Sequence, residues 1–443
     1  MDRPEEFSPA PFPIAPATLA DTGLSSDLVT GLVLKALHLA GEATGHELSK
    51  RIGLVFGVIG PVLESLKGQQ LCEIMGGAVI GGASYRYRLS DAGHRRAVAY
   101  LERSDYSGPA PVTLQQYRRY MDEFMRLAPR AATRQQVRDA FSHLVIDQSV
   151  LDQLGPAVNS GHSIFIYGPP GNGKSAMAKG VRRLLGGVIA IPHALEVDGQ
   201  IIRLFDASVH EPVAPPGLDK YGVDRYDLRW VVCKRPLISV GGELTLEALG
   251  LRYNPGSGVY RAPVQALANG GVLLIDDFGR QRCPPRELLN WWMVPLESRV
   301  EYLMLQSGEK LEMPFAALVI FSTNLRPADL VDEAFLRRIQ YKIYAENPTP
   351  DAYIRIFERC CQERGIPFER PMVEALIGSF YRPRRIELRA CQPRDLINQT
   401  LMLASYYGQP KQLTFELLLA ASASYFVDTS QVETTGSWAS IAS

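Results

Sequence analysis

The residues best suited to chemistry form one glycine-rich stretch that ends in a lysine and a serine. It runs Gly168-Pro169-Pro170-Gly171-Asn172-Gly173-Lys174-Ser175, with Ala176 next in the chain. Glycine-rich turns let successive backbone amides face a phosphate, the lysine reaches the terminal phosphates, and the hydroxyl is a ligand for Mg²⁺. The stretch directly follows apolar residues 163–167 and directly precedes a helical pattern, which is the context the motif requires. We therefore expect these residues to hold a phosphate chain, with Ser175 on the metal.

A second candidate is a pair of acids at the end of an apolar strand. Residues 272–275 are Val-Leu-Leu-Ile, and Asp276 and Asp277 follow them. Ligands of open α/β sheets bind at the carboxyl ends of the strands. We expect Asp276 to join Ser175 in the Mg²⁺ shell and Asp277 to polarise an attacking water.

These two motifs resemble those of the AAA+ ATPase superfamily, and three further segments resemble it in the same order over residues 131–426. They are Val319-Ile320-Phe321-Ser322-Thr323-Asn324 (similar to sensor 1), Glu333-Ala334-Phe335-Leu336-Arg337-Arg338 (the arginine-finger segment) and Pro393-Arg394-Asp395-Leu396 (sensor 2). The resemblance implies that ATP and Mg²⁺ bind, that Asn324 orients the attacking water, and that Arg394 contacts the nucleotide from a lid. It further implies that Arg337 or Arg338 reaches the γ-phosphate on a neighbouring subunit.

One residue departs from that superfamily's pattern. Many members carry glutamate where this chain has Asp277. Aspartate is one methylene shorter, so its carboxylate sits back from the water that it would polarise. An active ATPase and a slow, nucleotide-gated scaffold are both open at this point.

Apolar strands must position these side chains. The candidate strands are residues 163–167, 188–192, 272–276 and 317–322. Wholly apolar strands suit a parallel sheet covered by helices on both faces. The expected fold class is α/β: a P-loop NTPase core with a parallel sheet, preceded by an α+β winged-helix domain and followed by a helical lid.

Changes of pattern along the chain predict its domains. Prolines crowd the start, residues 26–103 have the helix and hairpin order of a winged helix, and Gly108-Pro109-Ala110-Pro111 indicates a linker. After residue 349 only helical spacing remains. The expected segments are a disordered arm (1–23), a winged-helix domain (24–106), a linker helix (107–130), the nucleotide-binding core (131–345), a helical lid (346–426) and a disordered tail (427–443).

The expected winged-helix domain could bind either a protein or DNA. Its third helix, residues 58–67, carries one lysine, one glutamate and an internal proline, whereas base readout needs exposed Arg, Asn, Gln or Lys. Arg86 and Arg88 in the wing, with Arg95 and Arg96 after it, form a modest basic cluster. A protein partner is favoured, and DNA binding stays as the alternative.

Other features resemble the MoxR-like, chaperone-like and enhancer-binding branches of the superfamily. Residues 301–313 predict a hairpin that turns at Ser307-Gly308, either an inserted working element or a plain sheet edge. Tyr221-Gly222-Val223 lies where ring ATPases often carry an aromatic pore loop, but its glycine comes second rather than third, so a glycine-containing surface turn is favoured. Trp291-Trp292 predicts core packing or a subunit interface.

Composition limits the remaining classes. The 443 residues are 46% hydrophobic with a formal net charge of zero, so a polybasic nucleic-acid coat is excluded. The six cysteines lack CxxC spacing and the seven histidines lack metal-ligand spacing. No apolar stretch predicts membrane insertion, and the start lacks the pattern of a signal peptide, so a cytoplasmic protein is expected. The resemblance implies a ring-shaped homo-oligomer, by analogy a hexamer, that remodels an unidentified client protein.

Overall fold

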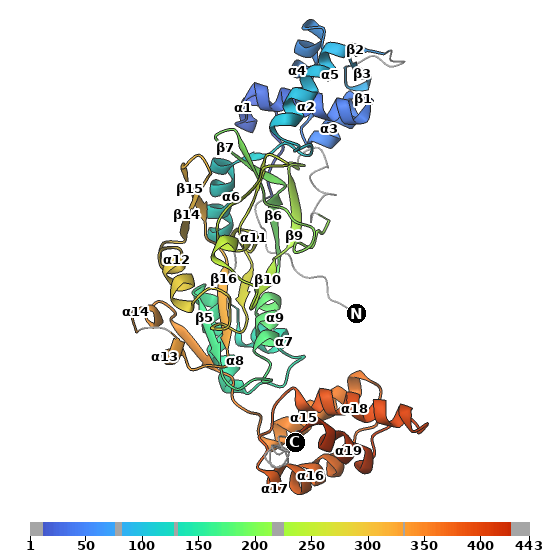
Figure 1. Ribbon diagram of the computed structural model, residues 1–443, viewed down its shortest axis with the longest axis vertical. Helices are drawn as coiled ribbons and strands as arrows, with labels where there is room; N and C mark the ends of the chain where they lie inside the picture. Colours follow the sequence, from blue (N-terminus) through green and yellow to red (C-terminus); the bar gives the residue numbers. More distant parts are fainter. Residues whose placement is uncertain (1–11, 76–81, 128–131, 215–225, 331–332, 427–443) are drawn as a thin grey trace, which may run out of the picture.

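The computed structural model describes residues 12–75, 82–127, 132–214, 226–330 and 333–426. Figure 1 shows an elongated arrangement of four parts from one end to the other: a helical N-terminal unit, a β-rich middle, an α/β core and a C-terminal helical unit. Among the described helices, none is long and apolar enough to cross a membrane.

A five-stranded parallel sheet forms the α/β core. Its strands are β5 (Ile164–Tyr167), β10 (Leu237–Val240), β13 (Val272–Ile275), β16 (Leu318–Thr323) and β17 (Tyr341–Tyr344). They lie in the order β10-β13-β16-β5-β17, and every neighbouring pair is parallel. The parallel sheet predicted from the apolar strands is confirmed, and the mixed α/β architecture is consistent with a P-loop NTPase core.

Alternate side chains of these strands enter two separate hydrophobic clusters. Phe165 and Phe321 pack with Trp292 of α12 (Pro285–Ser298) on one face of the sheet. Ile164 and Ile320 pack on the other face with helices α7 (Arg134–Ala140), α8 (Gln148–Ser160) and α9 (Lys174–Leu185). Both faces are therefore covered, which explains why β13 and β16 are buried along their whole length.

One strand assignment was wrong, and two strands were not predicted. Residues 188–192 form β6 (Val188–Pro192), but β6 pairs antiparallel with β9 (Trp230–Lys234) outside the parallel sheet. The parallel sheet instead uses β10 and β17. The apolar character of β6 comes from its burial in the cluster of the β-rich middle, where Tyr120 Oη accepts a hydrogen bond from the Ala190 amide at 2.8 Å.

The β-rich middle combines segments that are distant in sequence. A mixed sheet has the order β11 (Arg252–Asn254), β12 (Val259–Arg261), β8 (Gln200–Arg203), β7 (Ala194–Val197), β4 (Val112–Thr113). The short helical turn η3 (Leu246–Leu249) precedes β11, and the short helix α11 (Val264–Leu267) follows β12. Helix α6 (Leu114–Leu127), the predicted linker helix, buries Tyr117, Tyr120 and Phe124 in this part. It is therefore an integral part of the middle rather than a free connector.

The predicted hairpin is confirmed. Strands β14 (Val300–Met304) and β15 (Lys310–Pro314) pair antiparallel. Gly308 has φ +87° at the turn, a left-handed conformation that favours glycine. The hairpin lies in the chain between α12 and β16 of the core, and its Leu303, Leu311 and Met313 pack into the hydrophobic cluster of the β-rich middle.

The N-terminal unit contains helices and a small antiparallel sheet. Its elements are α1 (Leu19–Thr22), α2 (Ser26–Ala40), β1 (Glu42–Thr44), α3 (Gly45–Ile52), α4 (Phe56–Gly68), β2 (Cys72–Ile74), η1 (Gly82–Ser84), β3 (Arg86–Leu89) and α5 (Asp91–Arg103). The strand order is β1-β3-β2. Ser90 caps α5 by accepting a hydrogen bond from the Gly93 amide at 3.1 Å, as its position in the sequence predicts.

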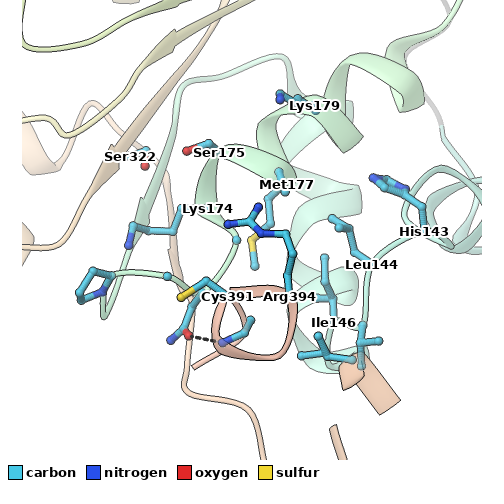
Figure 2. Close-up of a pocket in the computed structure, with 18 of the residues that line it drawn as sticks. His143, Leu144, Ile146, Lys174, Ser175, Met177, Lys179, Ser322, Cys391 and Arg394 are labelled. Carbon is cyan, nitrogen blue, oxygen red and sulfur yellow. Dashed lines mark hydrogen bonds between the residues drawn. The ribbon is translucent and has the colours of Figure 1, made fainter. Parts of the chain in front are cut away.

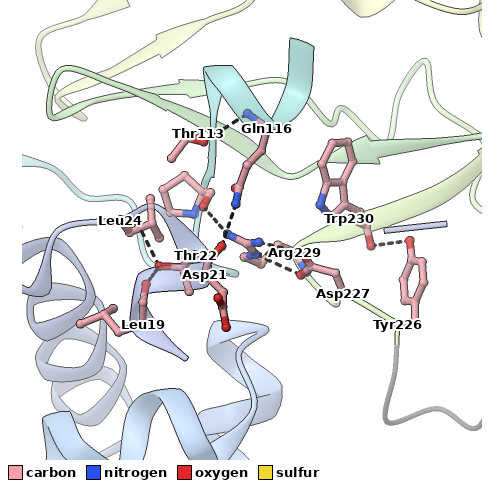
Figure 3. Close-up of polar contacts among 11 residues, drawn as sticks. Leu19, Asp21, Thr22, Leu24, Thr113, Gln116, Tyr226, Asp227, Arg229 and Trp230 are labelled. Carbon is pink, nitrogen blue, oxygen red and sulfur yellow. Dashed lines mark hydrogen bonds and ion pairs between the residues drawn. The ribbon is translucent and has the colours of Figure 1, made fainter. Parts of the chain in front are cut away.

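Part of the segment expected to be a disordered arm has defined contacts. Pro13 O accepts a hydrogen bond from the Asp227 amide at 3.0 Å, and Ile14 forms a β-bridge with Tyr226. Figure 3 shows the buried ion pair of Asp227 and Arg229 at this junction, with a 2.8 Å separation. Prolines prevent long helices, but their carbonyls still accept hydrogen bonds from another segment. Residues 1–11 and the predicted tail, 427–443, lie outside the described residues.

The C-terminal unit is helical over residues 350–425. Its elements are α15 (Pro350–Glu363), α16 (Arg370–Leu376), the π-helical η4 (Ile377–Tyr381), α17 (Arg382–Arg384), α18 (Gln392–Tyr406) and α19 (Phe415–Tyr425). They enclose their own hydrophobic cluster, which includes Tyr353, Phe357 and Leu418. A short connection from β17 joins this unit to the core (Figure 1).

Glu301 is a buried acid at the base of the hairpin. Its carboxylate accepts hydrogen bonds from Gln265 Nε2 at 2.8 and 3.0 Å and from Trp291 Nε1 at 3.0 Å. Burial raises the pKa of Glu301 from 4.5 to about 7, although these hydrogen bonds oppose the shift. The folded chain thus keeps a proton that the unfolded chain loses near pH 4.5.

The raised pKa predicts a loss of stability as the pH rises from about 4.5 to about 7. Substitution Glu301→Gln is expected to remove this loss. The free energy of unfolding of the variant, minus that of the wild type, should therefore be about 3 kcal/mol larger at pH 8 than at pH 4. Chemical denaturation at both pH values measures the difference, with the exposed Glu309→Gln on the same hairpin as the control. A variant-to-wild-type difference that does not change with pH would contradict the prediction.

Candidate functional site

The glycine-rich loop joins the end of β5 to the start of α9. Gly168, Gly171 and Gly173 have φ values of +141°, +83° and +76°, a region that L side chains rarely adopt. A Cβ on Gly168 would lie 2.5 Å from Ala345 O, just beyond β17. The glycines therefore give the loop its turn and allow it to pack directly on the adjoining backbone.

Lys174 lies at the first position of α9 with its ammonium turned back over the loop. Its Nζ donates to Gly168 O and Pro169 O, both at 2.9 Å, and to Asn324 Oδ1 at 2.6 Å. Burial lowers the pKa of Lys174, and the carboxylates of Asp277 and Asp276 oppose that shift. A cation is thus held beside the loop and close to two acids.

Ser175 and Asp276 come together as the sequence predicts for a shared metal. Ser175 Oγ donates to Asp276 Oδ2 at 2.7 Å. The Asp276 amide donates to Val240 O at 2.8 Å, which fixes the acid at the carboxyl end of neighbouring strands. A hydroxyl and a carboxylate are hard oxygen donors, and Mg²⁺ characteristically takes one or two protein ligands and completes its shell with phosphate and water. The pair therefore fits Mg²⁺.

Asp277 and Asn324 face each other beside this pair. Asn324 Nδ2 lies 3.5 Å from Asp277 Oδ1, while its Oδ1 accepts from Lys174. The turn after β13 is held against β16, because the Phe278 amide donates to Ser322 O and Thr323 Oγ1 donates to Phe278 O, both at 2.7 Å. Asn324 consequently connects the lysine to the second acid.

A pocket of about 650 Å³ contains these groups. Besides the loop, Asp276, Asp277 and Asn324, its lining includes the apolar residues Leu144, Val145 and Ile146. Figure 2 shows Leu144 and Ile146 along the side of the pocket that lies away from Lys174. The pocket thus has a charged end and an apolar end, which suits a ligand with a phosphate chain and a flat base. Within the described residues, no cluster of three or more His, Cys, Asp or Glu forms a separate metal site.

Arg394 reaches the pocket from the C-terminal unit. It lies in the first turn of α18, lines the pocket, and is labelled near its centre in Figure 2. Arg394 Nε donates to Asp395 Oδ1 at 3.0 Å, and this hydrogen bond raises the pKa of Arg394. The guanidinium is therefore a permanent cation that the C-terminal unit contributes to the pocket.

Arg337 and Arg338 differ in their surroundings. Arg338 forms an ion pair with Glu297 of α12 at 2.5 Å. Arg337 is exposed just after α14 (Glu333–Leu336), which follows α13 (Pro327–Leu330). Neither arginine is among the described residues that line the pocket of the same chain.

Several residues near the pocket were not singled out from the sequence. Ile356, Arg359, Cys360, Glu363 and Cys391 of the C-terminal unit line it. They form no motif in the sequence, and they reach the pocket only because the C-terminal unit packs against the core.

The Tyr221-Gly222-Val223 segment, predicted as a pore loop or a surface turn, lies outside the described residues. Trp292 is buried in the core, whereas Trp291 is 42% exposed.

Comparisons with known proteins match this chain only in part or distantly. Residues 349–424, in the C-terminal unit, match a family described as a domain of unknown function, DUF8689. No curated protein matches the chain.

Some solved structures resemble it. RuvB of Thermotoga maritima is 13% identical with a TM-score of 0.36, over 68% of this chain and 71% of that chain. NtrX from Brucella abortus is 15% identical with a TM-score of 0.39, over 72% of this chain and 64% of that chain. A T. maritima RuvB structure described as a Holliday junction branch migration motor is 13% identical with a TM-score of 0.34, over 66% of this chain and 71% of that chain.

Proposed function

We propose that this protein is a Mg²⁺-dependent ATPase of the AAA+ type, which hydrolyses ATP at subunit interfaces to remodel a partner protein or complex. The observation that carries the proposal is the convergence of four side chains from separate elements. Lys174 lies 2.6 Å from Asn324, and Ser175 lies 2.7 Å from Asp276. A cation, a metal-binding pair and a polar amide at the carboxyl edge of a parallel sheet match what phosphoryl transfer to water requires.

The loop and its lysine would bind the phosphates. Backbone amides of residues 168–176 and the positive end of α9 favour anions. Lys174 would exchange its bonds with Gly168 O and Pro169 O for the terminal phosphates. Ser175 and Asp276 would hold Mg²⁺, which supplies charge neutralisation at the β- and γ-phosphates.

Asp277 and Asn324 would position the attacking water. Asn324 already contacts both Lys174 and Asp277, so it can orient a water between the acid and the γ-phosphate. Asp277 would accept hydrogen bonds from that water. This division of work needs no further acid, because the leaving phosphate is stabilised by the metal and the lysine.

A neighbouring subunit would complete the site. An arginine that is free of an intramolecular ion pair is best suited to reach another subunit's γ-phosphate, because no bond must be broken first. Arg338 is engaged by Glu297, whereas Arg337 is exposed. We therefore assign the arginine finger to Arg337, in a ring that is by analogy a hexamer.

The C-terminal unit would act as a lid and the N-terminal unit as the partner-binding domain. Arg394 would sense the nucleotide from the lid, so that hydrolysis moves lid and core relative to each other. The N-terminal unit would be a winged helix that recognises protein. Its wing arginines are neutralised within the unit, because Arg86 pairs with Glu42 at 2.6 Å and Arg88 with Glu73 at 3.7 Å. Paired arginines contribute less to DNA phosphate contacts, so this observation favours a protein partner over DNA.

The direct test is release of phosphate from ATP by the purified full-length chain. Turnover is expected with Mg²⁺ and is expected to disappear with EDTA. Because the finger comes from a second subunit, the rate per chain should rise with protein concentration until the assembly is complete. A concentration-independent rate would contradict catalysis at subunit interfaces, and no turnover at any concentration would contradict the ATPase assignment.

The second test asks whether aspartate at position 277, where many AAA+ ATPases have glutamate, limits ATP turnover. Substitution Asp277→Glu is expected to keep ATP affinity and to raise turnover severalfold if water placement limits the wild type. The matched Asp277→Asn removes the negative charge and should reduce turnover by about 100-fold or more. Steady-state phosphate release and ATP titration separate the two effects. Wild-type turnover as slow as that of Asp277→Asn would support the nucleotide-gated scaffold instead.

A further inference from the structure

We infer that Asn172 is a positioning residue that ties the lid to the phosphate-binding loop, an inference that rests on the proposed function. Asn172 lies inside the loop and is 5% exposed. The glycine-rich motif requires only its backbone, since this position varies freely in the motif's pattern. The side chain nevertheless has three hydrogen-bond contacts, and they join the loop to two other segments of the chain.

The first two contacts reach the connection between β17 and α15. Asn172 Nδ2 donates to Asn347 Oδ1 at 2.8 Å and to Ala345 O at 3.3 Å. This connection is the stretch of chain that joins the core to the lid. The two bonds therefore hold the start of this connection against the loop.

The third contact reaches the lid itself. The Ala390 amide donates to Asn172 Oδ1 at 3.3 Å. The next residue supports it, because the Cys391 amide donates to Gly171 O at 2.9 Å. On the other side, Asn347 Nδ2 donates to Glu387 Oε2 at 3.2 Å. One buried amide thus lies at the centre of a network that connects loop, connection and lid.

The chemistry of the side chain suits this role. An amide group donates and accepts at the same time, so its Nδ2 can bond the connection while its Oδ1 bonds the lid. A carboxylate would lose the donor, and alanine would lose both. Buried hydrogen-bond groups are costly to leave unpaired, so the bonds favour one orientation of the lid over others.

That orientation determines where the lid's arginines lie. Arg394 follows Ala390 and Cys391 in the first turn of α18. Arg389, directly before Ala390, is near enough to Lys174 that its charge helps to lower the pKa of the lysine. Moving residues 389–394 away from the loop would withdraw Arg394 from the pocket and Arg389 from the neighbourhood of Lys174.

Hydrogen exchange of the full-length chain tests the bonds without requiring turnover. Substitution Asn172→Ala is expected to speed exchange of the 387–392 backbone amides at least about fivefold, because Ala390 loses its acceptor. Asn347→Ala, which leaves the glycine-rich loop unaltered, should produce a smaller change in the same direction. The control Asn398→Ala removes a lid asparagine that bonds Arg364 and should leave these amides unchanged. Unchanged exchange in both test variants overturns the inference.

A double-mutant cycle tests the coupling to chemistry. Arg394→Ala is expected to slow turnover in the wild-type background but to add little in the Asn172→Ala background, because the arginine is already displaced. Effects that simply multiply would overturn the inference while leaving the ATPase assignment intact, provided that the wild type turns over ATP. If the wild type shows no turnover, the proposed function fails, and hydrogen exchange alone decides the role of Asn172.

Discussion

Replacing Lys174 with alanine is expected to abolish tight ATP binding. The ammonium is the cation nearest the loop's backbone and bonds two of its carbonyls and Asn324. Charge-assisted hydrogen bonds to phosphate are strong, so the dissociation constant for Mg-ATP should rise by about 100-fold or more. Titration with ATP by calorimetry, before any turnover measurement, gives this number directly.

The matched control is Arg183→Ala, which removes an exposed cation from the same helix, α9. It should bind ATP as the wild type does. Thermal unfolding without nucleotide should show both variants folded, since Lys174 contributes no apolar core. Retained tight ATP binding by Lys174→Ala would contradict the phosphate assignment and, with it, the proposed function.

Replacing Arg337 with alanine is expected to reduce turnover about 1,000-fold while leaving ATP affinity nearly unchanged. An arginine finger stabilises charge that develops in the transition state, and supplying one accelerates phosphoryl transfer by about 10³- to 10⁵-fold. Arg338→Ala is the matched comparison, because it removes a neighbouring arginine that pairs with Glu297. Steady-state turnover of the two variants, at a concentration where the assembly is complete, measures the difference.

Mixing variants shows whether the arginine acts on another subunit. Arg337→Ala keeps an intact pocket, and Lys174→Ala keeps an intact arginine. Neither should turn over ATP alone, whereas an equimolar mixture should recover part of the activity at mixed interfaces. If the mixture stays inactive, or if Arg338→Ala proves to be the slower variant, Arg337 is not the finger that acts between subunits.

The sequence alone predicted the features that depend on local backbone geometry and on the edge of a parallel sheet. The glycines of the loop indicate a tight turn, and Gly168, Gly171 and Gly173 indeed have positive φ values. An acid that follows an apolar strand must lie at that strand's carboxyl end, so Asp276 meets Ser175 although they are far apart in the sequence. The hairpin predicted over residues 301–313 is also present, because its turn glycine and its alternating pattern are local properties.

The sequence did not predict which distant strands pair with each other. The strand β6 is as apolar as its counterparts in the parallel sheet, yet it pairs with β9. An apolar sequence indicates that a strand is buried, but it does not indicate which strand pairs with it. The sequence likewise assigned residues 1–23 to a disordered arm because of their prolines, whereas Pro13 bonds Asp227 and Ile14 bridges Tyr226.

The sequence by itself therefore determined the turn of the glycine-rich loop, the position of the two acids at the end of β13 and the α/β class, because backbone conformation and burial follow from neighbouring residue types. Only the tertiary structure decided the order of the strands in the sheet and the ion pair with Glu297 that distinguishes Arg338 from Arg337. It also decided the contacts of Asn172 with Asn347 and Ala390. These depend on which surfaces meet when the units pack, and packing partners are selected by shape and hydrogen bonding across the whole chain.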